Sequence, residues 1–343
     1  MKSIRKIIEK NYDFCIDNMV QIKEGNTSNK YVLFSDTGKF ILRIRNPCFT
    51  KKAIISDHVF MDYLKENNFP VAKIIRNKKG EIFISENGCL YEIQSYIDHN
   101  KNLSDFNMSS VSNELFSFLG EFHHLSGKYK KGIKKSAYLG KTLIPLDNEE
   151  KYFNGPLKYG VERNKLLLKK MDIKYRSVFE KDLNYFITYL EKLQKEYNNK
   201  IKNHKLLINH NDFFGNNILF KNNKISGLVD FDFCNSGVYY IDLVEALHGS
   251  MIWDNDEMKY LGITKNGDIR LDVARENLQQ YFNKNPDFIY DGKFLIKLLI
   301  VKIISLAFYP AFDFLGSLED KIEGFNRRKK VIKNLEEINE IKI

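Results

Sequence analysis

Alternating and turn-bounded apolar segments near the start of the chain predict a β-rich amino-terminal part. The segments are Met19–Lys23, Lys30–Ser35 and Lys39–Ile44. Gly25–Asn29 and Asp36–Gly38 separate them and have the composition of turns, so we expect two consecutive β-hairpins.

Most of the remaining chain has the apolar spacing of helices. Ser104–Ser126 has apolar residues at helical intervals, with Ser104 as the expected N-cap. Further helices are expected at Leu183–Tyr197, Tyr239–Trp253, Asp272–Asn283, Asp291–Phe312 and Ser317–Ile338.

Length and composition agree with a soluble protein of two parts. With 343 residues and 43% apolar content, the chain can bury two cores. We therefore expect an α+β fold, with a β-rich amino-terminal part and a mostly helical remainder. The apolar run Phe294–Tyr309 contains Lys297 and Lys302, so it predicts a buried helix rather than a membrane span.

One group of polar residues carries the most specific chemistry. His210, Asp212 and Asn217 lie within the segment 207–220, and Asp230 follows thirteen residues after Asn217. Phosphoryl transfer from a nucleotide to a hydroxyl requires carboxylates and amides placed around magnesium. Asp212 would orient the acceptor hydroxyl and take its proton, while Asn217 and Asp230 would supply oxygen ligands to Mg²⁺.

The residues between these two metal ligands predict a β-hairpin. Ile218–Phe220 and Ile225–Val229 are short apolar runs joined by the turn-forming Lys221–Lys224. Such a hairpin would bring Asn217 and Asp230 to the same end, where they could share one ion. The alternative is that His210 is a core histidine and that the acidic and amide side chains only cap turns and strand ends.

These segments resemble the aminoglycoside phosphotransferase superfamily, which includes choline kinases. The resemblance rests on 210–220, on Gly227–Asp232 and on 235–243, which carries Asp242–Leu243 at the head of a helix. The stretch 207–247 is most similar to the type II homoserine kinase branch. The resemblance implies a two-lobed, protein-kinase-like fold, with His210 in a structural role and Asp232 near a second ion or the acceptor.

The same resemblance implies nucleotide contacts in the amino-terminal part. Gly25, Ser28 and Asn29 would cover the phosphates through backbone N–H groups, although the loop taken by itself is better explained as an ordinary hairpin turn. Arg43 lies where the family has a strand cation that pairs with phosphates, and Asp57 lies where a Glu usually anchors that cation. Both depart from the usual Lys and Glu, and two solvated surface charges are the alternative.

The strand Leu90–Ile97 is expected to lead into the hinge of this fold. The backbone of Gln94, Ser95, Tyr96 and Ile97 would then meet the adenine edge. The segment 127–173 has no clear periodicity, and we expect it to build the acceptor-binding wall or to form a surface loop.

Charge and cysteine usage limit the other classes of function. The net charge is +10, but the lysines are scattered and no nucleic-acid-binding motif is present, so we expect no nucleic-acid partner. Four widely separated cysteines and a start without an apolar signal core predict a cytoplasmic protein with no membrane partner. The sequence does not indicate whether the protein is a monomer or an oligomer.

The sequence thus predicts an ATP- and Mg²⁺-dependent kinase of small-molecule hydroxyls, without distinguishing ATP from GTP. An aminoglycoside-type antibiotic or an amino alcohol such as homoserine would be the acceptor. For a cationic acceptor, Asp254, Asp256, Glu257 and Glu276 are a candidate acidic patch. The alternative is a protein that keeps the fold and binds a ligand or partner without turnover.

Overall fold

The computed structural model describes residues 2–22, 28–45, 51–106, 108–130, 173–200, 204–254, 256–257, 262–307 and 317–343. They group into two compact units. The first contains the described residues of 1–103 and 215–235, with Tyr129 and Lys130; the second contains the rest. The hairpin expected to carry the metal ligands therefore groups with the amino-terminal sheet.

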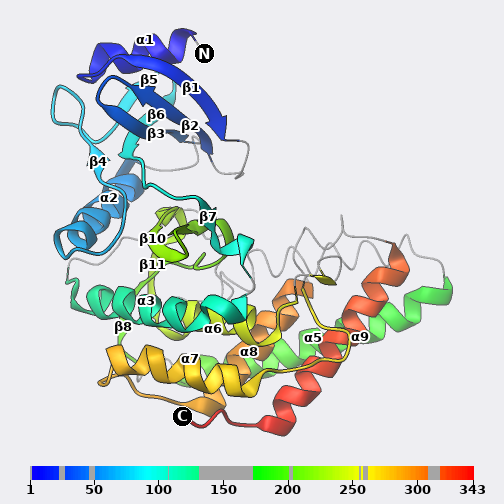
Figure 1. Cartoon of the computed structure of the whole chain (residues 1–343). Coiled ribbons are helices and arrows are strands. Elements are labelled where there is room, and N and C mark those ends of the chain that lie inside the picture. Colours follow the sequence, from blue (N-terminus) through cyan, green and yellow to red (C-terminus); the bar gives the residue numbers. More distant parts are fainter. Residues whose placement is uncertain are drawn as a thin grey trace. The chain divides into compact units, whose positions relative to one another are not determined.

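The first unit is built on an antiparallel sheet with the strand order β1-β2-β3-β6-β4, and β5 pairs with β6 (Figure 1). Its strands are β1 (Ile16–Ile22), β2 (Ser28–Ser35), β3 (Gly38–Arg45), β4 (Ile74–Ile75), β5 (Ile84–Glu86) and β6 (Cys89–Ser95). The expected hairpin of β2 and β3 is confirmed. Ser28 and Asn29 belong to β2 rather than to a turn.

Side chains alternate across this sheet and give its two faces different chemistry. Helix α1 (Lys2–Asn11) packs on an apolar face that includes Leu33, Leu42 and Ile93. Because successive strand residues point to opposite faces, Arg43 and Glu92 belong to the other face, where helix α2 (Lys51–Glu66) lies. The sequence pattern did not reveal α1.

A small sheet of β7 (Lys101–Asn102), β9 (Ile218–Lys221) and β10 (Lys224–Leu228) completes the first unit. The predicted hairpin of β9 and β10 is confirmed, with a register shift between Ile225 and Gly227. Leu228 N–H donates to Pro70 O at 2.9 Å, which ties the hairpin to the chain that follows α2. Gly227 allows this approach, since a Cβ there would lie 2.6 Å from Ile97 Cδ1.

The second unit is mostly helical. Its elements are α3 (Met108–Lys128), α5 (Ile173–Lys200), β8 (Leu206–Asn209), α6 (Tyr240–Leu247), the π-helical turn η5 (His248–Ile252), α7 (Leu271–Lys284), α8 (Gly292–Ala307) and α9 (Leu318–Ile338), together with all but the first residue of η1 (Leu103–Asp105) and of β11 (Asn235–Val238). All six expected helices are present, although α3 begins at Met108 rather than after Ser104. Ser317 and Asp320 form a capping box at the start of α9.

Helix α8 is buried around most of its circumference, as its apolar sequence predicted. Its two lysines are paired, Lys297 with Glu196 and Lys302 with Glu245. Within the described residues, no helix is long and apolar enough to cross a membrane. Three cysteines, Cys15, Cys89 and Cys234, are described and all are free. The expected acceptor segment 127–173 lies almost entirely outside the described residues.

Candidate active site

The predicted catalytic loop follows β8 in the second unit, and a buried carboxylate fixes its backbone. Asp242, in the first turn of α6, accepts hydrogen bonds from the backbone N–H of His210 at 2.6 Å and of Asn211 at 2.7 Å. Asn211 has a left-handed backbone, with φ of 60°. A residue in that conformation needs external support, which Asp242 provides.

Asp242 is itself held by a series of buried side-chain hydrogen bonds. His123 Nε2 lies 3.1 Å from its Oδ2, and His123 Nδ1 lies 2.6 Å from the hydroxyl of Tyr281. Since a carboxylate only accepts, Nε2 carries the proton and the Tyr281 hydroxyl donates to Nδ1. Burial and the Asp242 charge raise the pKa of Tyr281 well above its ordinary value, so it remains a donor.

The loop is also held by aromatic packing. His210 is fully buried and its ring contacts Phe122 and Phe213 edge-on. The ring of Phe214 packs against that of Trp253, with 5.6 Å between the ring centroids. Phe214 also packs against Gly249 of the π-helical turn, where a Cβ would lie 2.6 Å from the Phe214 ring. Asp212 is half-buried between these anchored residues, and Phe214 N–H donates to its carbonyl at 2.8 Å. The predicted catalytic residue thus lies in a loop with a fixed backbone.

The two predicted metal ligands belong to the first unit and lie at the same end of the β9–β10 hairpin. Asn217 immediately precedes β9, and Val229 N–H donates to its carbonyl at 2.9 Å. Asp230 comes next along the chain, in a left-handed conformation with φ of 68° and ψ of 61°. The expected juxtaposition of these two residues by a hairpin is therefore present in the backbone.

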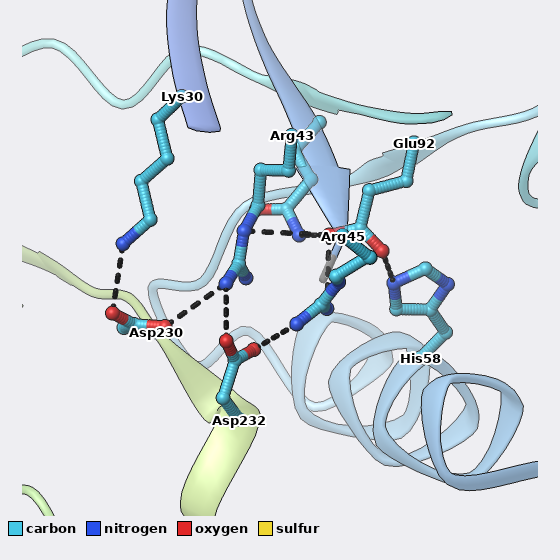
Figure 2. A network of polar contacts seen from close by, with 8 residues as sticks. Lys30, Arg43, Arg45, His58, Glu92, Asp230 and Asp232 are labelled. Carbon is cyan, nitrogen blue, oxygen red and sulfur yellow. Dashed lines mark hydrogen bonds and ion pairs between the residues drawn. The ribbon is translucent and has the colours of Figure 1, made fainter. Parts of the chain in front are cut away.

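Strand cations face Asp230 and the second acidic residue of the Asp-Phe-Asp segment (Figure 2). Lys30 Nζ lies 2.8 Å from Asp230 Oδ2, and an Arg43 amino group lies 3.0 Å from Asp230 Oδ1. The same Arg43 nitrogen lies 2.7 Å from Asp232, which also pairs with Arg45. Burial opposes ionisation of Asp232, but the two arginines hold its pKa well below the ordinary range.

A buried glutamate completes this charged face. Glu92 is opposite Arg43 in the β3–β6 register and lies 2.9 Å from Arg45, 3.5 Å from Arg43 and 2.9 Å from His58 of α2. Burial alone would raise its pKa, but the neighbouring Arg45 and His58 lower it to about 2. Glu92 is therefore an anion in the folded protein at neutral pH.

The expected pairing of Arg43 with Asp57 is not among the ion pairs of the described residues. Asp57 is buried on α2, and burial raises its pKa well above the ordinary value. Its neighbour His58 reaches the network instead, and Glu92 is the glutamate beside the strand cation. The shorter Asp side chain left this pairing uncertain from sequence, and β6 supplies the carboxylate.

The other predicted nucleotide-binding residues are distributed along β2 and β6. Gly25 lies outside the described residues, while Ser28 and Asn29 form the start of β2, opposite Arg45 and Ile44. Ser95 N–H donates to Lys73 O at 2.8 Å and Tyr96 N–H to Lys39 O at 3.3 Å.

Several backbone groups of the predicted hinge residues are already used in hydrogen bonds within the protein, which narrows the candidates for an adenine contact. Gln94 is buried and paired with both β3 and β4. Ile97 follows β6, and its carbonyl interacts with His99 Nδ1 at 2.8 Å. Of the four predicted residues, Tyr96 through its carbonyl and Ile97 through its N–H are the strongest candidates for an adenine contact.

The proposed acidic patch for a cationic acceptor is partly used by the protein itself. Glu257 pairs with Arg327 at 2.8 Å, and Asp254 Oδ1 accepts from the backbone N–H of Asp256 at 2.9 Å. Glu257 is therefore engaged with α9, and Asp254 with its own turn.

Sequence reasoning missed the four residues Lys30, Arg45, His58 and Glu92. A usable signal was present: Arg43 and Arg45 alternate with apolar Leu42 and Ile44, and Glu92 alternates with Tyr91 and Ile93. Strand periodicity would have placed these charges on one face of the sheet. These charges form the buried network of Figure 2.

Comparison with known proteins identifies the class. The model of the phosphotransferase enzyme family matches residues 18–270. The chain therefore belongs to the phosphotransferase enzyme family. No curated protein sequence matches it at a significant level.

Three solved structures share the fold at low sequence identity. A choline kinase from Cryptosporidium parvum is 16% identical with a TM-score of 0.64, covering 98% of this chain and 96% of that one. Spectinomycin phosphotransferase, solved with ADP and spectinomycin, is 13% identical with a TM-score of 0.62 and 98% coverage of both chains. Amicoumacin kinase, solved with AMP-PNP and Ca²⁺, is 15% identical with a TM-score of 0.62, covering 97% and 93%.

These comparisons confirm the predicted family and the kinase-like α+β fold class. They do not confirm the narrower resemblance to the type II homoserine kinase branch.

Proposed function

We propose that this phosphotransferase transfers the γ-phosphoryl group of ATP to a hydroxyl of a small molecule, using Mg²⁺. The observation that carries the proposal is the end of the β9–β10 hairpin. There Val229 N–H donates to Asn217 O, which brings Asn217 next to the residue that precedes Asp230, and Arg43 faces Asp230. An amide and a carboxylate beside a strand cation suit a metal-bound triphosphate.

The donor chemistry of this site fits magnesium. Asp230 and Asn217 offer hard oxygen atoms, which Mg²⁺ prefers. In the described residues, no group of three or more His, Cys, Asp or Glu side chains forms a metal site. This agrees with an ion that takes one or two protein ligands and completes its shell with phosphates and water. Bound there, magnesium would neutralise charge on the phosphates.

The residues of the chain would divide the remaining work. Asp212, in the loop fixed by Asp242, would orient the acceptor hydroxyl and accept its proton. Arg43 would contact the phosphates, with Glu92 beside it. The backbone of Tyr96 and Ile97 would bind adenine, and Gly25, Ser28 and Asn29 would cover the phosphates. The part at 1–97 would hold the nucleotide, and the part at 98–343 would carry the catalytic loop, metal ligands and acceptor site.

The family and the structural neighbours support a small-molecule acceptor. The structural neighbours are named for spectinomycin, amicoumacin, choline and aminopropanol, which are small molecules rather than proteins. We therefore propose an amino alcohol or an aminoglycoside-type antibiotic as the acceptor. A cytoplasmic location remains a prediction.

A panel assay tests this function. The full chain is incubated with ATP, Mg²⁺ and single acceptors, including choline, homoserine, aminopropanol and aminoglycosides, and phosphorylated product is detected by mass spectrometry. We expect one acceptor class to be phosphorylated and the product to disappear when EDTA removes magnesium.

One observation favours a second candidate, a non-catalytic protein that binds a ligand without turnover. Both carboxylate oxygens of Asp230 already face cations, Lys30 and Arg43. Thermal stabilisation by Mg·ATP without phosphorylation of any acceptor, and without ATP hydrolysis, would support this alternative and contradict the proposed kinase.

A further inference from the structure

Lys30 is a strand lysine that faces another cation. It lies on β2 directly opposite Arg43 of β3, so the two cations are cross-strand neighbours on the face that carries Glu92. Like charges directly opposite each other destabilise a sheet. Its described ion pair is with Asp230, at 2.8 Å from Oδ2.

The two cations on Asp230 differ in how firmly they are held. Arg43 contacts three carboxylates, Asp230, Asp232 and Glu92, and its side chain is 4% exposed. The Lys30 side chain is 16% exposed and ends in a flexible four-carbon stem. An ion that binds Asp230 through Oδ2 would therefore displace Lys30 more readily than Arg43.

Charge balance indicates where Lys30 would go. Lys30, Arg43 and Arg45 are matched by Glu92, Asp230 and Asp232, and burial raises the pKa of Asp57, which disfavours its charged form. A divalent cation at Asp230 would make this cluster strongly positive. The anion that arrives with it is the nucleotide phosphate chain, which is within reach of the same metal.

We propose that Lys30 is a second phosphate-binding cation, which pairs with Asp230 and moves to the nucleotide phosphates when a metal–nucleotide complex binds. This inference rests on the proposed nucleotide site and adds a residue from β2 to it. Lys30 thereby couples metal binding at Asp230 to phosphate binding.

Calorimetric titration of the full-length protein with Mg·ADP and with adenosine tests the proposal without relying on turnover. Lys30→Met removes the charge at similar length, and Lys30→Arg retains it. Lys224→Met is the matched control, since Lys224 is an exposed lysine at the turn end of the same unit's hairpin. Adenosine, which lacks phosphates, reports whether each variant keeps a folded nucleoside site.

Lys30→Met should weaken Mg·ADP binding roughly 10- to 100-fold, the value of one or two charge-assisted hydrogen bonds. Adenosine binding should be unchanged, and Lys30→Arg and Lys224→Met should stay within about threefold of wild type.

The opposite result has a clear meaning. If Lys30 serves only to hold Asp230, Lys30→Met would free that carboxylate and Mg·ADP would bind equally or more tightly, which overturns the inference alone. If the wild-type protein binds neither ligand, the proposed function fails together with it.

Discussion

Replacing Asp232 by Asn tests the buried charge network most severely. Asp232 is fully buried and accepts from both Arg43 and Arg45, so the neutral amide removes one anionic charge from two buried guanidinium groups that also face Glu92. Removing one partner of a buried pair costs about 3–5 kcal/mol. Total stabilities are about 5–15 kcal/mol, so the loss should be large.

Hydrogen–deuterium exchange of the β3 peptide measures this loss of stability within the first structural unit, which contains the network. Since about 1.4 kcal/mol corresponds to a factor of ten, amide protection in Gly38–Arg45 should fall by roughly two to three orders of magnitude. Asp13→Asn is the control, because the Asp13 side chain is 83% exposed and lies 3.7 Å from Lys78. Equal protection in the Asp232→Asn and Asp13→Asn proteins would refute the reasoning.

Two further predictions concern acids of the same network. The pKa of Glu92 is lowered from 4.5 to about 2, so its contribution to stability is complete above pH 4.5 and is lost as the pH falls toward 2. Glu92→Gln should therefore lower the urea midpoint of unfolding at neutral pH. A difference in urea midpoint between the variant and wild type that does not change with pH would contradict this. The raised pKa of Asp57 means that the unfolded state loses its proton above pH 3.8 while the folded state keeps it, so stability is lost as the pH rises. Asp57→Asn should therefore gain stability relative to wild type as the pH rises above 3.8, whereas a loss of stability over the same rise would show that Asp57 acts as a charged partner of Arg43.

The sequence predicted the elements whose side-chain periodicity is strong. The β2–β3 and β9–β10 hairpins and the helices from α3 to α9 follow from turn residues and apolar spacing, which are local properties. Helix α1 was not predicted, although Ile4, Ile7 and Ile8 have helical spacing among its charged residues. The short strands β4, β5 and β7 depend on their partners, so two or three residues carry no usable period.

The sequence predicted those site residues that lie close to each other along the chain. It did not predict residues that reach the site from distant strands. Asn217 and Asp230 were brought together by a hairpin that the sequence itself encodes. Glu92 reaches Arg43 from a strand about fifty residues away along the chain, and nothing local distinguishes it from Asp57 as the partner of that arginine.

The central claim is phosphoryl transfer through the loop that contains Asp212. The most direct test is the rate of transfer from ATP to the acceptor found in the panel, for wild type, Asp212→Asn and the exposed control Asp36→Asn. Loss of the group that takes the hydroxyl proton should lower kcat by roughly 10²- to 10⁴-fold, with Mg·ADP affinity unchanged. An Asp212→Asn protein that transfers phosphate at the wild-type rate would contradict the account.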